Sequence, residues 1–152
     1  MANIVYLEDV PHFLPIVAFF NFREWHVGEI SLDEIIMRYQ RRMQKDAIPT
    51  SLVAIEDTMP VGSVSIKEND LPERPDIGPW LASLYVIPDY RGRNIGRELL
   101  RAGEGAARDA GVKRLYLFTH TARGLYQKEG WAHLEDAEWK RGITISIYYK
   151  DL

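Results

Sequence analysis

Residues 84–100 read LYVIPDYRGRNIGRELL, and this stretch decides the fold of the chain. An apolar strand stops at Pro88, a turn with Gly92 and Gly96 follows, and a helix begins within a few residues. Such a turn directs backbone N–H groups and the positive end of a helix toward one point, which is how proteins bind phosphate with few side chains. Glycine lets the backbone approach the ligand closely. The stretch therefore predicts a loop that binds a phosphate-bearing ligand.

The charge around this loop differs from that of the whole chain. Four arginines and one glutamate lie between Arg91 and Arg101, whereas the chain has a formal net charge of -3. Arg93, Arg97 and Arg101 share one face at helical spacing. A polyanionic small ligand fits this contrast, and the alternative is the solvated basic face of an ordinary amphipathic helix. The patterns G-x-x-x-x-G-K-[ST] and G-x-G-x-x-G are absent, which excludes the common nucleotide and dinucleotide loops.

The order of the expected elements points to a mixed sheet. Ser31 and Glu34 form a capping box, which begins a helix. Two strand patterns flank the turn-like residues 57–60 and predict a hairpin. A strand, a helix and another strand follow, and this order predicts a parallel βαβ unit near the middle of the sheet. The expected strands are 4–7, 51–56, 61–67, 80–87, 115–118, 131–137 and 143–149, and the expected helices are 11–25, one from 31, 94–110 and 122–128.

Length and composition limit the possible classes of protein. With 152 residues, 46% of them hydrophobic and none cysteine, the sequence predicts one globular domain over residues 1–152 without disulfides. The net charge argues against a nucleic-acid partner. The longest apolar run, 13–20, contains Pro15 and is much shorter than the roughly 20 residues of a membrane span. We therefore expect a cytoplasmic protein that binds neither membrane nor nucleic acid.

Two motifs give the chain a resemblance to a known family. Residues 91–96, RGRNIG, follow Val86-Ile87-Pro88 and match the pattern [RQ]-x-x-G-x-[GA], except that Asn94 stands where glycine is usual. Residues 125–131, LYQKEGW, match the pattern [LF]-Y-x-x-x-G-[FWY]. In these motifs and in its order of elements the chain resembles the GNAT superfamily of acyl-CoA-dependent N-acyltransferases. Asparagine is the residue with a side chain that best tolerates a positive φ, so the change is a mild one.

The resemblance implies a fold and a co-substrate. The fold is a mixed α/β architecture with a mostly antiparallel sheet of about seven strands, flanked by about four helices, whose strands splay around acetyl-CoA. The resemblance implies no metal, and His12, His26 and His133 have no spacing that suggests one. The residues that would bind acetyl-CoA are the strand backbone of Leu84, Tyr85 and Val86, the loop residues Arg91, Gly92, Arg93, Asn94, Ile95, Gly96 and Arg97, and Thr119, which stands where the family often has asparagine.

The resemblance also implies a reaction. A neutral primary amine attacks the acetyl thioester, and a backbone N–H near Val86 polarises the carbonyl oxygen. By its place in the second motif, Tyr126 is the general acid that stabilises or protonates the departing sulfur. Glu68 is the candidate base that takes the proton of the amine. Asp70 and Ser83 are candidate contacts of the amine substrate.

The acceptor and the catalytic status stay open at this point. Residues 67–78 contain four acids and two bases, which favours a cationic amine unless the segment is a solvated loop. The partner is a small-molecule or peptide amine, and the chain is a monomer or a homodimer. The alternative to an enzyme is a non-catalytic module that binds or senses acetyl-CoA, which would fit Asn94, Thr119 and the absence of an acid from strand 80–86.

Overall fold

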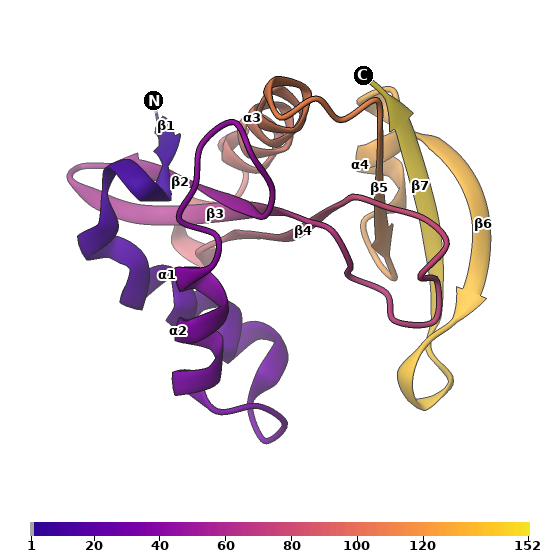
Figure 1. Ribbon diagram of the computed structural model, residues 1–152, viewed down its shortest axis with the longest axis horizontal. Helices are drawn as coiled ribbons and strands as arrows, with labels where there is room; N and C mark the ends of the chain where they lie inside the picture. Colours follow the sequence, from indigo (N-terminus) through magenta and orange to yellow (C-terminus); the bar gives the residue numbers. More distant parts are fainter. Residues whose placement is uncertain (1) are drawn as a thin grey trace.

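The computed structural model describes residues 2–152, with the side chain of Arg123 outside the described part, and forms a mixed α/β fold (Figure 1). The strands are β1 (Asn3–Tyr6), β2 (Thr50–Glu56), β3 (Met59–Lys67), β4 (Trp80–Val86), β5 (Arg114–Thr119), β6 (Ala132–Glu138) and β7 (Thr144–Asp151). The α-helices are α1 (Leu14–Asn21), α2 (Leu32–Gln40), α3 (Ile95–Asp109) and α4 (Arg123–Lys128). A π-helix (Phe22–His26) follows α1 directly.

The seven strands form one sheet in the order β1-β2-β3-β4-β5-β7-β6. In the described part of the chain, β4 and β5 are the only parallel neighbours, and α3 connects them. The other neighbours are antiparallel, and short turns join β2 to β3 and β6 to β7. The predicted mixed, mostly antiparallel sheet of seven strands with four α-helices and a central βαβ unit is therefore confirmed.

Strands β4 and β5 lie side by side only where β4 begins. Trp80 is paired with Tyr116, and no other residue pair joins the two strands within residues 2–152. Beyond that pair the ribbons diverge, so that β1–β4 and β5–β7 form two half-sheets (Figure 1). Ser83, at a φ of 56°, lies where the register between β3 and β4 shifts, and the bulge bends β4 as the separation opens.

Helices cover both faces of the first half-sheet. Gly103 of α3 lies close to Leu81, Ile66 and Val64, which identifies the face that α3 covers. Helices α1 and α2 pack together on the opposite face, where Val53 joins their core. The side chains of a strand alternate between these faces, so β3 contributes Val64 and Ile66 to α3. The buried side chains around α1 and α2 are Leu7, Leu14, Val17, Ala18, Ile35 and Tyr39.

The first expected helix, 11–25, is divided into three segments. Pro11–Phe13 form a 3₁₀ turn, regular α-helix covers only α1, and the π-helix completes the segment. Pro15 explains the late beginning, because proline is accepted in the first turn of an α-helix but not within its hydrogen-bonded body. The second helix begins as predicted, since the Glu34 N–H donates to Ser31 Oγ at 3.1 Å.

The expected turn over residues 57–60 is shorter than predicted. Only Asp57 and Thr58, with φ of 51° and 67°, form the turn, and β3 already begins at Met59. Pro60 is accepted within the strand because the register shifts beside it, and proline lacks the N–H of a regular ladder.

The connection between β3 and β4 folds over the second half-sheet. Leu71 is buried there with Trp80. Arg74 donates to Asp76 and to Glu135 of β6, which fastens the connection to the outermost strand. Two of the four carboxylates of this connection, Asp70 and Asp76, contact basic side chains. No helix within residues 2–152 has the length and apolar character needed to cross a membrane.

Candidate active site

The loop predicted to bind phosphate lies between β4 and α3. Gly92 and Asn94 adopt left-handed φ of 78° and 67°, and Asn94 is the N-cap of α3. Asparagine therefore takes the conformation for which glycine is usual. The first residues of α3 border a pocket of about 210 Å³, where the positive end of a 15-residue helix favours an anion. The pocket is lined by Val86, Tyr90, Arg91, Gly92, Asn94, Ile95, Gly96, Arg97 and Leu125.

Two of the predicted arginines contact the protein itself. Arg91 donates from Nε to the Val86 carbonyl oxygen at 2.8 Å, and its guanidinium lies 5.5 Å from the centre of the Tyr85 ring. Arg93 lies over the Tyr90 ring at 4.8 Å. These contacts hold the loop against the end of β4 and leave both side chains exposed at its rim.

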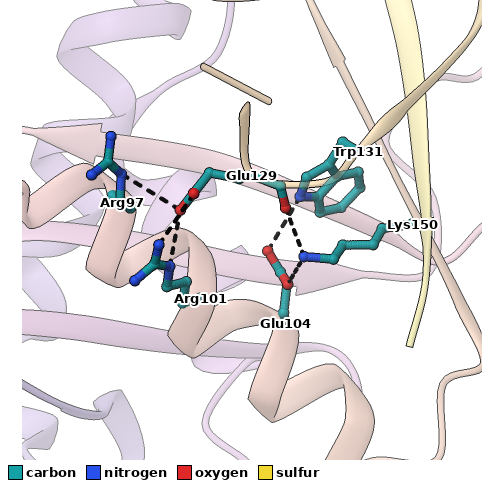
Figure 2. Close-up of polar contacts among 6 residues, drawn as sticks. All are labelled: Arg97, Arg101, Glu104, Glu129, Trp131 and Lys150. Atoms are coloured by element: carbon teal, nitrogen blue, oxygen red, sulfur yellow. Dashed lines mark hydrogen bonds and ion pairs between the residues drawn. The ribbon is translucent and has the colours of Figure 1, made fainter. Parts of the chain in front are cut away.

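Glu129, which ends α4, holds the other two arginines (Figure 2). Its carboxylate lies 3.5 Å from Arg97 Nε and 2.9 Å from Arg101 Nε. The hydrogen bonds from Arg101 and the charges of both arginines lower the pKa of Glu129. The basic face predicted for a ligand is therefore partly neutralised by a carboxylate that lies far away in the sequence.

A second carboxylate continues this network inside the protein. Glu104 of α3 is only 5% exposed and accepts from Lys150 Nζ at 2.6 Å and from Trp131 Nε1 at 3.2 Å (Figure 2). Lys150 also donates to the Glu129 carbonyl oxygen at 2.8 Å. A buried charge is tolerated when it is paired and hydrogen-bonded. The network thereby joins α3, β7 and the turn that follows α4.

The end of β4 presents backbone groups to the gap between the half-sheets. The Ile87 N–H donates to the Val61 carbonyl oxygen of the preceding hairpin at 2.9 Å. Successive N–H groups of a strand point to opposite sides, so the Val86 N–H points away from β3 and into the gap. The Val86 carbonyl is taken by Arg91, and the neighbouring backbone of Leu84 has the same orientation as that of Val86.

Helix α1 supports the bulge in β4 from the opposite face. Asn21, only 5% exposed, donates from Nδ2 to Ser83 Oγ at 2.9 Å. Next to this pair, the Tyr85 ring contacts Phe20 and Trp25, with ring centres 5.5 and 6.1 Å apart. An aromatic wall therefore lies beside the point at which the half-sheets separate.

Tyr126 lies on α4 and is 8% exposed. Its ring centre is 6.5 Å from that of Trp131 and 6.1 Å from that of Tyr148, so packing fixes its position. Burial raises the pKa of Tyr126 to about 12. The phenol is therefore protonated near neutral pH and can donate a hydrogen bond.

Thr119 ends β5 and shapes the beginning of α4. Its Oγ1 accepts from the Ala122 N–H at 3.1 Å and from the Thr121 N–H at 3.3 Å. Both interactions use the oxygen, so the hydroxyl proton stays available to a ligand. The residue thus combines a structural contact with the predicted hydroxyl contact.

Glu68 and Asp70 lie at the other end of β4. Lys67 is paired with Trp80, and its Nζ lies 3.0 Å from Asp70 Oδ1. Glu68 is exposed and follows Lys67 directly. Ser83 is three residues beyond Trp80, a separation of about 10 Å along an extended strand. The structure therefore brings the loop, the gap and Ser83 together, whereas Glu68 lines a second pocket and Asp70 lies beside Lys67.

Sequence reasoning missed three features of this region. Asn21 carried no signal because it lies in an apolar helix 62 residues before its partner. Glu129 occupies a variable position of the motif at residues 125–131. Its contacts with Arg97 and Arg101 become visible only in the folded structure. Glu29 contacts Lys140 and Arg141 at 3.6 and 3.8 Å, and it joins the turn before α2 to the turn between β6 and β7.

With this geometry in view, the chain was compared with known proteins. The model of the acetyltransferase (GNAT) family matches residues 16–131, which include the loop, the gap and Tyr126. The chain belongs to the GNAT family of acetyltransferases. No curated protein matches the sequence significantly.

Solved structures share the GNAT fold over nearly the full length of the chain. A GNAT acetyltransferase from Streptococcus pneumoniae has 21% identity and a TM-score of 0.74, with 100% of both chains covered. A Salmonella typhimurium protein solved with its cofactor acetyl-CoA has 16% identity and a TM-score of 0.73, covering 99% of this chain and 94% of that one. An aminoglycoside 6'-N-acetyltransferase complexed with coenzyme A has 15% identity and a TM-score of 0.76, covering 98% and 96%.

Proposed function

We propose that this chain transfers an acetyl group from acetyl-CoA to the nitrogen of a primary amine, with Tyr126 as the hydrogen-bond donor that stabilises the departing sulfur. The observation that carries the proposal is the gap between β4 and β5, which opens beside the anion pocket at the beginning of α3. Family membership and the acetyl-CoA and coenzyme A found in two structures of the same fold support it.

The residues at the gap fit acetyl-CoA. The loop from Arg91 to Arg97 offers the N–H groups of a helix beginning and a positive rim to a pyrophosphate. The Leu84 backbone and the Val86 N–H have no partner in β5, so an extended pantetheine arm can bind them as an added strand would. Bound acetyl-CoA supplies a thioester whose carbonyl carbon forms the C–N bond and whose C–S bond breaks.

Side chains and backbone then act on two atoms of that thioester. The Val86 N–H points into the gap and is suited to polarise the carbonyl oxygen. Proton transfer from a phenol with a pKa of about 12 to a thiolate of an ordinary thiol, with a pKa of ~8.5, is uphill by about 5 kcal/mol. Tyr126 therefore stabilises the departing thiolate with a hydrogen bond, and the proton of the amine completes the product thiol.

The amine must lose a proton before or during the attack. Glu68 is the candidate base and lies about 10 Å or more along the strand from Ser83, so it would act through ordered water. Ser83, which Asn21 orients, is the candidate polar contact of the amine, and Asp70 acts on the acceptor only through its ion pair with Lys67.

The proposal is tested by following free-thiol release from acetyl-CoA with a panel of small amines, lysine peptides and free peptide N-termini. We expect release that depends on the acceptor, and we expect Tyr126→Phe to lower kcat about 10²–10⁴-fold with little change in KM for acetyl-CoA. Tyr149→Phe on β7 is the matched control, because it removes a phenol from a residue outside the site.

Two results would overturn parts of this proposal. If Tyr126→Phe keeps kcat within threefold of the original, Tyr126 has no part in the reaction. If calorimetry shows tight binding of acetyl-CoA but no amine releases thiol, the chain is the non-catalytic sensing module instead.

A further inference from the structure

A second pocket lies on the face of the sheet that α1 and α2 cover, and its lining is strongly basic. It has a volume of about 300 Å³, and it lies between the end of α2 and the end of β3. Four of its lining residues are cations, and one is a carboxylate. The lining residues are Arg38, Arg41, Arg42, Pro49, Lys67, Glu68 and Asn69.

Arg42 is the feature that distinguishes this pocket from a solvated basic surface. It is only 5% exposed, and its guanidinium lies 4.3 Å from the centre of the Tyr39 ring. Nη1 donates to Ser65 Oγ at 3.0 Å. Among the side chains that the structure describes, no carboxylate forms an ion pair with Arg42 or with Arg41. A buried charge without a counter-charge is unfavourable, so an anion in the pocket would be stabilised.

The acidic groups near the pocket do not cancel its charge. Glu34 lies 3.7 Å from Arg38, and Asp70 lies 3.0 Å from Lys67. Glu68 is the only carboxylate among the lining residues, and it is exposed. The pocket therefore keeps a net positive charge, which comes from Arg41 and Arg42.

The pocket lies on the same side of the sheet as the bulge, but its Lys67 end is about 10 Å from Ser83, so a substrate must be long enough to span that distance. Ser65, which receives the hydrogen bond of Arg42, is paired with Ala82, the residue before Ser83. Opposite residues of antiparallel strands have Cβ atoms about 5 Å apart. Asn21 reaches Ser83 from the same helices, so Arg42 and Ser83 face the same side of the sheet.

From this arrangement we infer that the acceptor is an amine whose acidic group lies several bonds from its nitrogen, such as an ω-amino acid, and that Arg42, Arg41 and Lys67 bind that group. The inference rests on the proposed N-acetyl transfer and names its substrate class. It departs from the cationic amine expected from the sequence, because Asp70 and Asp76 within residues 67–78 pair with Lys67 and Arg74.

The experiment compares ω-amino acids of increasing length with their own carboxamides as acceptors, because each pair differs only in the acidic group. The probes of binding are an N-acetyl amino acid and its N-acetyl carboxamide, titrated by calorimetry in the presence of coenzyme A. The variants are Arg42→Met, Arg41→Gln and Lys67→Met. Arg41 and Lys67 are exposed and half-buried, so their variants test the pocket even if Arg42→Met fails to fold. Arg108→Gln, an exposed cation at the end of α3, is the control.

We expect Arg41→Gln and Lys67→Met each to raise KM for the amino acid about 10-fold, and Arg42→Met to raise it more. KM for acetyl-CoA and for the carboxamide should change less than twofold, and the N-acetyl acid should bind at least 10-fold more weakly to the variants. Equal turnover of acids and carboxamides, unaffected by the variants, would overturn the inference and leave the proposed transfer intact. No thiol release with any amine would overturn the proposed transfer, whereas selective binding of the N-acetyl acid would still support an acid-binding pocket.

Discussion

Glu129 partly neutralises the basic face of α3 by contacting two of its arginines. The sequence places Arg97 and Arg101 one turn apart, and such a pair attracts any polyanion. The structure gives both a shared carboxylate, whose own side chain is only 10% exposed. Because Glu129 directly follows α4, its ion pairs with Arg97 and Arg101 hold the turn after α4 against α3.

Removing the charge of Glu129 should destabilise the protein in a manner that depends on pH. The folded state holds the pKa of Glu129 below its ordinary value, so its stabilisation is full above the unfolded pKa of about 4.3 and is lost as pH falls through the folded pKa. We expect Glu129→Gln to lower Tm at pH 7, and the difference from the original chain to shrink below about pH 4.

Differential scanning calorimetry at the two pH values checks this expectation. Glu98→Gln is the control, because Glu98 lies on the same helix and makes no ion pair with any side chain that the structure describes. A Tm difference for Glu129→Gln that is the same at both pH values would remove the ion pair as its cause.

Glu68 provides a second prediction for a single residue. If it takes the proton of the amine through water, Glu68→Gln should move the acidic limb of the pH profile of kcat/KM and leave KM for acetyl-CoA unchanged. The measurement is the initial rate of thiol release from about pH 6 to pH 9 with one acceptor. Glu73→Gln, on the same connection, is the matched control. An unchanged profile would exclude Glu68 as the base.

Among the elements, α3 packs very closely on the sheet at Gly62 of β3. A methyl group on Gly62 would lie 2.7 Å from the Tyr85 carbonyl oxygen and 2.9 Å from Leu99 Cδ1. The first contact is with backbone, so it cannot be relieved by rotating a side chain. The absence of a side chain at Gly62 therefore lets β3, β4 and α3 meet beside the gap.

Two glycine variants test this close approach. We expect Gly62→Ala to lower the free energy of unfolding by about 1–3 kcal/mol, because strand or helix must shift. Gly105→Ala should raise it by up to about 1 kcal/mol, since the position is helical and a methyl group there meets nothing within 4 Å. Urea denaturation gives both values. Equal effects of the two substitutions would show that space at Gly62 is not limiting.

Local patterns explain which elements were predicted correctly. The capping box at Ser31 and the glycine turn before α3 act within a few residues, so their consequences are visible in the sequence. The division of the first helix was missed, because the five-residue π-helix has the same composition as an α-helix. The beginning of β3 was misplaced because a bulge, which no local signal announced, accommodates Pro60.

The candidate site divides in the same way. The loop residues were predicted from a short motif in consecutive positions, and all of them except Arg93 line one pocket. Arg42 was not identified, because its burial and its missing counter-charge result from the packing of α2 on β3. The same holds for Asn21, whose partner is fixed only when α1 covers β4.

For the whole molecule, the single residue pair between β4 and β5 means that ligand binding in the gap should increase the stability of the folded state. A ligand in the gap contacts both half-sheets, so it stabilises only the folded chain. At about 100 times its Kd, acetyl-CoA should raise the free energy of unfolding by about 2.7 kcal/mol. It should also slow hydrogen exchange at the Val86 N–H, which has no partner in β5.

Thermal unfolding with increasing acetyl-CoA and amide exchange measured by mass spectrometry check both parts. Adenosine 3',5'-bisphosphate, which lacks the pantetheine arm, serves as the control ligand and should protect the loop alone. Slower exchange in the loop but not in β4 with acetyl-CoA itself would show that the arm does not lie in the gap.

The gap has one more consequence, for the behaviour of the protein without its ligand. Strand edges with unpaired N–H and C=O groups are templates for the strands of other molecules, and natural proteins usually protect them at the outside of a sheet. Here two such edges lie in the middle of the sheet, between β4 and β5. Acetyl-CoA bound in the gap would also cover these edges, so we expect the empty protein to be the form that precipitates first.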